Sequence, residues 1–143
     1  MLKNRAIPSP QQLAELRTLP IFARFEDAEL ALIARRLTDV EVPAGAVLVK
    51  EGQPGREAFI VASGSAVIQV GDQVTGNAGA GDLVGEMALL DGRPRAATVT
   101  SVTPMRLLVM DPSEFGRLLE DPRTARWIAA SLSNRVRAGE HPV

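Results

Sequence analysis

The fold is decided by the stretch GDLVGEMALLDGRPRAATV, residues 81–99. We expect it to run as strand, short helix, turn and strand. Gly85 allows the backbone to approach a ligand closely, and the free N–H groups of a short helix over Glu86–Leu89 attract an anion. Arg95 can meet two phosphate oxygens with its planar fork of donors, and Glu86 can accept a hydrogen bond from a sugar hydroxyl. The stretch therefore predicts a pocket for a small ligand with a phosphate and a sugar.

Around this stretch, from Val40 to about Met110, short runs rich in valine and isoleucine are interrupted by Gly, Pro, Asn or Asp. Many short strands at such spacing favour a sandwich, roll or barrel over a parallel α/β sheet. The expected strands are Asp39 to Val42, Ala46 to Lys50, Glu57 to Ala62, Ser65 to Val70, Ala97 to Val102 and Arg106 to Asp111.

Helices are expected on both sides of the strands. Three helix starts pair a capping side chain with proline in the first turn: Ser9-Pro10, Asp111-Pro112 and Asp121-Pro122. A further amphipathic helix is indicated by Leu30, Ile33, Ala34 and Leu37. In the last helix, from Asp121 to about Arg137, the apolar stripe is Ala125, Ile128, Ala129, Leu132 and Val136.

Composition narrows the functional classes. The chain has 143 residues, 45% hydrophobic, which suits one domain. It has no cysteine, and its single histidine is His141, so a catalytic triad, a cupin-like metal centre or any other thiolate or multi-histidine metal site lacks its usual residues, and we expect no metal. We expect no catalytic residue and no enzyme activity.

The charge balance and hydropathy point to an ordinary soluble protein. A net charge of -1 with 16 scattered basic residues disfavours direct nucleic-acid binding. No run approaches the length of a membrane span, and Met1 to Pro10 lacks the apolar middle of a secretion signal. We therefore expect a cytoplasmic protein.

The phrase GEMALLDGRPRAATV closely resembles the phosphate-binding cassette of cyclic nucleotide-binding domains, found in cAMP-dependent kinase regulatory subunits, cyclic nucleotide-gated channels and catabolite activator-like regulators. The resemblance extends from about Leu16 to Arg137. Outside the cassette it is carried by Leu19-Pro20-Ile21-Phe22, Val42-Pro43-Ala44-Gly45, Lys50-Glu51-Gly52-Gln53-Pro54-Gly55 and Ser63-Gly64.

The resemblance implies a mainly β fold: an eight-stranded antiparallel β-roll, or jelly roll, flanked by N-terminal helices and two C-terminal helices that act as hinge and lid. As a single domain, residues 1–143 would divide into a helical lead-in (9–38), a roll (39–111) with its cassette (84–98), and C-terminal helices (112–138). We expect no helix-turn-helix after the last helix.

The resemblance also implies the site. Arg95 would pair with the exocyclic phosphate oxygens and Glu86 with the ribose 2′-hydroxyl, while backbone N–H groups complete the cradle. Domains that prefer cGMP often have threonine at the position of Ala96, so cAMP is the expected ligand and cGMP the alternative. The predicted ligand-binding residues are Val84, Gly85, Glu86, Met87, Ala88, Arg95, Ala96, Ala97 and Arg135.

Less direct predictions concern the base. The candidates for the apolar wall are Val84, Met87, Val74 and Val99. Val84 stands where the family often has phenylalanine. Arg135 is the favoured cap over the base because guanidinium stacks on aromatic planes, with Trp127 and Leu132 as alternatives. Trp127 is better explained by core or hinge packing.

The expected function is a regulatory cyclic nucleotide sensor that signals by moving segment 113–137, which another domain or protein reads. Two alternatives stay open. One is a degenerate interaction module of the same fold that binds no nucleotide. The other is a regulatory domain excised from a channel, transporter, kinase or transcription factor. The oligomeric state is left open.

Overall fold

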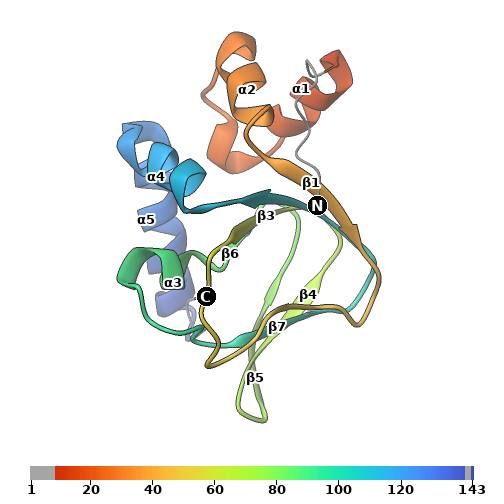
Figure 1. Cartoon of the computed structure of the whole chain (residues 1–143), viewed down its shortest axis with the longest axis vertical. Helices are drawn as coiled ribbons and strands as arrows, with labels where there is room; N and C mark the ends of the chain where they lie inside the picture. Colours follow the sequence, from red (N-terminus) through yellow and green to blue (C-terminus); the bar gives the residue numbers. More distant parts are fainter. Residues whose placement is uncertain (1–8, 141–142) are drawn as a thin grey trace.

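The strands of the computed structural model form two antiparallel sheets that face each other (Figure 1). The structure describes residues 9–140 and 143, so the predictions for segment 1–8 and for His141 lie outside the described residues. The first sheet has the order β1 (Thr38–Val42), β8 (Met105–Met110), β3 (Ala58–Ser63), β6 (Leu83–Val84). The second has the order β2 (Val47–Val49), β7 (Thr98–Ser101), β4 (Ala66–Val70), β5 (Gln73–Ala78). The predicted mainly β antiparallel roll is confirmed.

The first sheet separates two hydrophobic cores, because successive side chains of a strand point to opposite faces. On β3, Phe59 and Val61 face the interior of the roll, whereas Ala58 and Ile60 face the helices. The roll interior consists of Val49, Phe59, Val61, Ala66, Ile68, Ala78, Val84, Ala97, Val99, Met105, Leu107, Val109 and Val143.

Six predicted strands are confirmed to within one or two residues, and β6 is the strand that was expected, without bounds, before the short helix, whereas β5 was not predicted. The β5 sequence QVTGNA contains Gly76 and Asn77, residues that strands disfavour, and β5 is an edge strand with exposed side chains. Strand β6 has only two residues. Both are held by pairing with neighbours, which a local pattern does not reveal.

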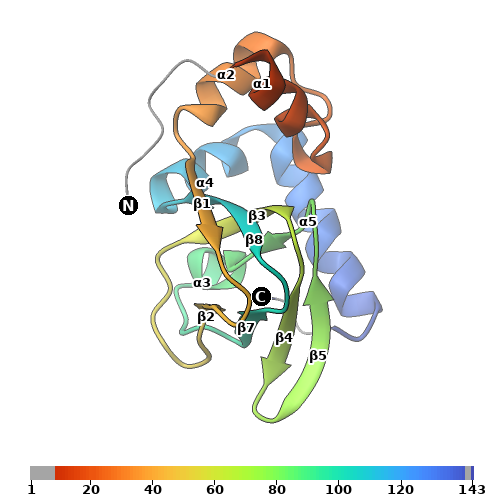
Figure 2. The same ribbon diagram turned by 90° about the vertical axis from the view of Figure 1, so that its right-hand side faces the viewer.

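The helices lie on the outer side of the first sheet (Figure 2). The N-terminal group is α1 (Pro10–Arg17), the 3-10 helix η1 (Pro20–Phe22) and α2 (Asp27–Ala34). The C-terminal pair is α4 (Pro112–Glu120) and α5 (Pro122–Arg137). The three predicted helix starts are confirmed, since the side chains of Ser9, Asp111 and Asp121 each accept a hydrogen bond from a first-turn N–H.

The predicted apolar stripe of α5 is partly wrong. Ile128 is buried, but Ala129 and Val136 are exposed, and the buried face also carries Thr124 and Arg135. The Thr124 hydroxyl donates to the carbonyl oxygen of Leu118, which satisfies it inside the core. Within residues 9–140 and 143, no helix has the length and hydropathy needed to cross a membrane.

Candidate functional site

The short helix α3 (Glu86–Asp91) lies directly after β6 and is bounded by two glycines. Gly85 precedes it with φ 89° and Gly92 follows it with φ 68°. Both angles fall in the left-handed region, where glycine has no steric penalty. These two turns bring the N–H groups of the first turn of α3 to the edge of the roll interior.

Arg95 lies buried beside Gly85. Its Nη1 donates to the carbonyl oxygen of Gly85 at 2.7 Å, and its Nη2 donates to that of Glu57 at 2.7 Å. Burial lowers the pKa of the Arg95 guanidinium, and the nearby carboxylates of Glu57 and Glu86 oppose that shift. Because both acceptors are neutral carbonyls and arginine has five N–H donors, the guanidinium still has donors and charge for an anion.

Two glycines make the room that Arg95 occupies. A Cβ added at Gly55 would lie 2.3 Å from Nε of Arg95, and one added at Gly85 would lie 2.7 Å from Nη1. Contacts this short are not sustained between real atoms, so a side chain at either position would displace the guanidinium. The glycine turn at residues 50–55 therefore supports the site as well as a strand connection.

Glu86 is the most unusual polar group of the site. Its side chain is 1% exposed, and within the described residues its Oε2 has no hydrogen-bond partner. Burial raises the pKa of the Glu86 carboxyl to about 7, against the opposing effects of a backbone hydrogen bond and of the charges on Arg135 and Arg95. A buried acceptor without a donor is costly, so a donor brought to Oε2 by another molecule would be favoured.

The predicted apolar wall is only partly assembled as expected. Val84, Ala97 and Val99 are fully buried in the roll interior. Ala88 is buried, and Met87 and Ala96 are half-buried beside them. The prediction for Val74 is wrong: it is 59% exposed on the outer side of β5.

Arg135 lies at the junction between α5 and the segment before β6. It is 7% exposed, and its guanidinium forms ion pairs with Asp82 at 3.7 Å and with Glu140 at 3.4 Å. Neither acidic partner was predicted from the sequence. Trp127 and Leu132, the alternative caps, are partly buried against the helical core.

The sequence also gave no indication of the position of Val143. This residue is 3% exposed in the interior of the roll, and the Met87 N–H donates to its main-chain oxygen at 3.5 Å. Glycine at position 139, two residues after the end of α5, is typical of a chain reversal and is the feature that could have indicated it.

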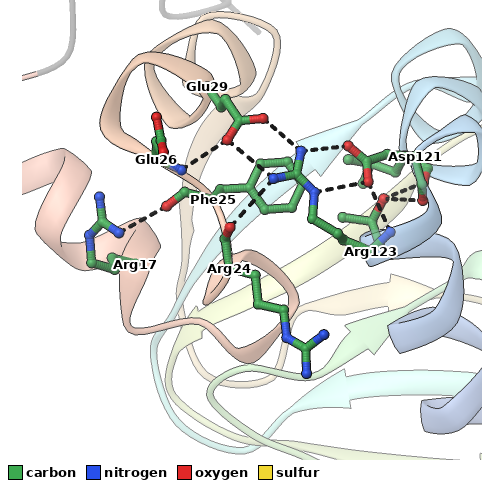
Figure 3. Close-up of polar contacts among 9 residues, drawn as sticks. Arg17, Arg24, Phe25, Glu26, Glu29, Asp121 and Arg123 are labelled. Atoms are coloured by element: carbon green, nitrogen blue, oxygen red, sulfur yellow. Dashed lines mark hydrogen bonds and ion pairs between the residues drawn. The ribbon is translucent and has the colours of Figure 1, made fainter.

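A second arginine joins the start of α5 to the N-terminal helices (Figure 3). Arg123 pairs with Asp121 at 2.8 Å and with Glu29 at 2.6 Å, and its Cζ lies 3.8 Å from the centre of the Phe25 ring. The two carboxylates raise the pKa of Arg123, and Arg123 in turn lowers the pKa of Glu29 and that of Asp121. We call these four residues the Arg123 clasp. It fixes the first turn of α5 to α2.

Comparison with known proteins relates most of the chain to one family. A model described as the cyclic nucleotide-binding domain matches residues 39–122. A cyclic nucleotide-gated potassium channel of Mesorhizobium japonicum is 39% identical over 100 residues, which are 70% of this chain and 28% of the channel. A cAMP-dependent protein kinase regulatory subunit of Mycosarcoma maydis is 37% identical over 113 residues, covering 73% of this chain and 22% of that protein. The chain thus spans about a quarter of the length of these curated relatives.

The likeness extends to solved structures. A structure of cAMP-bound PfPKA-R matches with a TM-score of 0.79 and 27% sequence identity. The match covers 89% of this chain and 44% of that one.

Proposed function

Because this chain belongs to the cyclic nucleotide-binding domain family, as its cassette indicated, we propose that it is a regulatory domain that binds a cyclic nucleotide beside α3. Relatives that it matches are named as a cyclic nucleotide-gated channel and a cAMP-dependent kinase regulatory subunit. The domain would therefore be the regulatory part of a larger cytoplasmic or membrane-associated protein, with no catalytic role of its own.

The observation that carries the proposal is Oε2 of Glu86, which has no hydrogen-bond partner in the described part of the chain, near the buried Arg95. A ribose 2′-hydroxyl would donate the hydrogen bond that this oxygen lacks. The cyclic phosphate would accept from the remaining donors of Arg95 and from backbone N–H groups of Gly85, Glu86, Ala88 and Ala96. Such a ligand brings a donor to the buried acceptor and an anion to the buried cation, which is electrostatically favourable at both points.

The proposed ligand is cAMP, with cGMP binding more weakly. Ala96 has no hydroxyl to bond the amino group of guanine, and the matched solved structure contains cAMP. Val84, Ala97 and Val99 would form the apolar wall, and Arg135 would cap the base after leaving Asp82 and Glu140.

The proposed signal is a rearrangement of α4 and α5. Arg135 on α5 already contributes to the electrostatics of Glu86, so a ligand that binds Glu86 changes the surroundings of the end of α5. A ligand shifts such an equilibrium only by its differential affinity for the two positions of the helix. Another domain or protein would then read the position of α5.

The test of binding is isothermal titration of cAMP and of cGMP into the chain after removal of any co-purified nucleotide. Micromolar or tighter binding of cAMP, with weaker binding of cGMP, supports the proposal. Absence of binding for both would favour the alternative of a degenerate module, which the paired presence of Glu86 and Arg95 opposes. Hydrogen exchange that does not change in residues 111–137 on adding cAMP would rule out the helix signal.

A further inference from the structure

The interior of the roll is partly filled by the chain itself. Val143 packs in the same cluster as Val84, Ala97 and Val99, the residues expected to face the base and ribose. In two views at right angles, the C-terminal mark lies between the two sheets, next to α3 and β7 (Figures 1 and 2). A residue of the chain therefore lies in the space where the ligand is proposed to bind.

A defined turn directs the chain back into the roll. The N–H of Gly139 donates to the carbonyl oxygen of Val136 at 3.1 Å, and the N–H of Glu140 donates to that of Arg135 at 2.9 Å. With φ 76° at Gly139, these two bonds form a Schellman motif at the end of α5. The reversal is thus a built feature of the helix terminus.

Glu140 secures the returning chain against β5 and α5. Its Oε2 lies 3.4 Å from Nη1 of Arg135, and a Cβ added at Gly76 would lie 3.0 Å from the Glu140 carboxyl carbon. Gly76 thereby leaves space on β5 for this side chain. The same Arg135 that we propose as the cap over the base is held by this contact.

Val143 also contacts the first turn of α3. Its main-chain oxygen accepts from the Met87 N–H at 3.5 Å, a long contact beside the N–H groups assigned to the phosphate. The side chain of Val143 packs against the apolar wall and its main-chain oxygen faces α3, so Val143 occupies part of the proposed nucleotide site. Val143 and a nucleotide cannot occupy it together.

We propose that Val143, directed by the turn at Gly139, is an intramolecular occupant of the nucleotide pocket that cAMP must displace. The inference rests on the proposed function, since it concerns the regulation of the same site. Displacement would break the Glu140–Arg135 contact, release Arg135 and free the end of α5. The entry of cAMP and the movement of α5 would then occur together. The apparent affinity for cAMP would be reduced, because only the molecules whose pocket is not filled by Val143 can bind it.

The test uses Val143→Asn, which places an amide in an apolar interior without adding charge, and Val102→Asn as its matched control. Val102 is 58% exposed in the β7–β8 turn. Burial of the valine side chain stabilises the filled pocket, and asparagine loses that stabilisation. We therefore expect cAMP to bind Val143→Asn about tenfold more tightly than the unmodified chain, a difference of about 1.4 kcal/mol. The control should match the unmodified chain within about twofold.

A second variant, Gly139→Val, changes the turn and leaves the pocket residues unchanged. A Cβ there meets nothing within 4 Å, so its effect comes from the positive φ, which a β-branched residue resists. It should also tighten cAMP binding. Equal cAMP affinity in the unmodified chain and both variants would overturn the inference.

Hydrogen exchange without nucleotide keeps the two proposals separate. The Met87 amide should exchange several-fold faster in Val143→Asn than in the unmodified chain, because it loses its acceptor and cover. Unchanged exchange at Met87 would overturn the occupancy of the pocket by Val143. If no chain bound cAMP, the proposed function would fail, while the exchange rates would still decide where Val143 lies.

Discussion

Two arginines join distant parts of this chain, and their partners differ in kind. Arg95 is buried between Gly55 and Gly85 and donates to two backbone carbonyls. Arg123 is about a third exposed and pairs with the carboxylates of Glu29 and Asp121 over the ring of Phe25. The charge of Arg123 is already neutralised by two carboxylates. The guanidinium of Arg95 is held by two carbonyls, and among the described residues no carboxylate forms an ion pair with it. The difference separates an arginine that holds the fold from one that is available to a ligand.

The largest expected effect is the loss of binding in Arg95→Ala. Removing a buried charged donor to phosphate should weaken cAMP binding roughly a thousandfold, or about 4 kcal/mol. Isothermal titration measures it, with Arg93→Ala as the control because Arg93 is exposed in the same cassette. Equal losses in the two variants would mean that Arg95 has no special role.

The second prediction concerns Glu86 and pH. The pKa of its carboxyl is raised to about 7 in the folded protein. Between pH 4.5 and pH 7, the folded state therefore holds a proton that the unfolded state has released. The stability that this protonation contributes is complete below the ordinary carboxyl pKa near 4.5 and is lost as the pH rises through about 7.

Between pH 5 and pH 8, the ligand-free chain should therefore lose about 2–3 kcal/mol more unfolding free energy than Glu86→Gln does. Urea unfolding at both pH values measures the difference. If the unmodified chain and Glu86→Gln lost the same unfolding free energy between the two pH values, the prediction of a raised pKa for Glu86 would be wrong. Saturating cAMP should reduce the difference, because its hydroxyl hydrogen-bonds the ionised form.

A smaller effect is expected from Gly55→Ala. The new Cβ would lie 2.3 Å from Nε of Arg95, so the guanidinium must move from its two carbonyl acceptors. We expect cAMP affinity to fall about tenfold. Gly79→Ala is the matched control, because a Cβ there meets nothing within 4 Å and Gly79 has no positive φ. Unchanged affinity in Gly55→Ala would show that Arg95 needs no fixed position.

The smallest effect should come from Arg123→Ala. This change removes the ion pairs and the contact with Phe25, and it should lower the urea midpoint of unfolding only slightly, because exposed ion pairs contribute little to stability. Its cAMP affinity should stay within about twofold of the unmodified chain. Arg126→Ala, an exposed neighbour on α5, is the control for stability. A large loss of affinity in Arg123→Ala would mean that the Arg123 clasp also acts on the pocket.

The sequence predicted this fold well where one residue type has one structural use. Proline after a capping side chain indicated the starts of α1, α4 and α5, and glycine-bounded runs indicated six strands. The prediction failed where contacts with neighbouring elements determine the structure. Strand β5 is held by pairing with β4 despite Gly76 and Asn77, and the buried face of α5 includes Thr124 and Arg135 because hydrogen bonds and ion pairs satisfy them.

The site could be predicted to a similar degree. Glu86 and Arg95 were named from the chemistry of their side chains and from the resemblance of residues 85–99 to the family cassette, and both are buried in the structure. The lack of a partner for Oε2 of Glu86 among the described residues depends on how the folded chain buries it, and the sequence does not show this. The places of Gly55, Glu140 and Val143 depend on contacts between segments far apart in the chain, which have no local signature.

The two-sided burial of β3 has a consequence for how its register is specified during folding. A strand with one solvent-exposed face has a well-specified register, because a shift by one residue would bury its polar side chains. In β3, the residues from Ala58 to Val61 are apolar on both faces. Alternation therefore gives β3 little protection against a slip. Gly64, directly after the strand, restricts the register instead. A Cβ there would lie 2.4 Å from the carbonyl oxygen of Pro104, so only glycine at this point lets the β3–β4 corner meet the β7–β8 corner. A single close approach between two turns can thus select one pairing of the central strands from several of similar hydrophobicity.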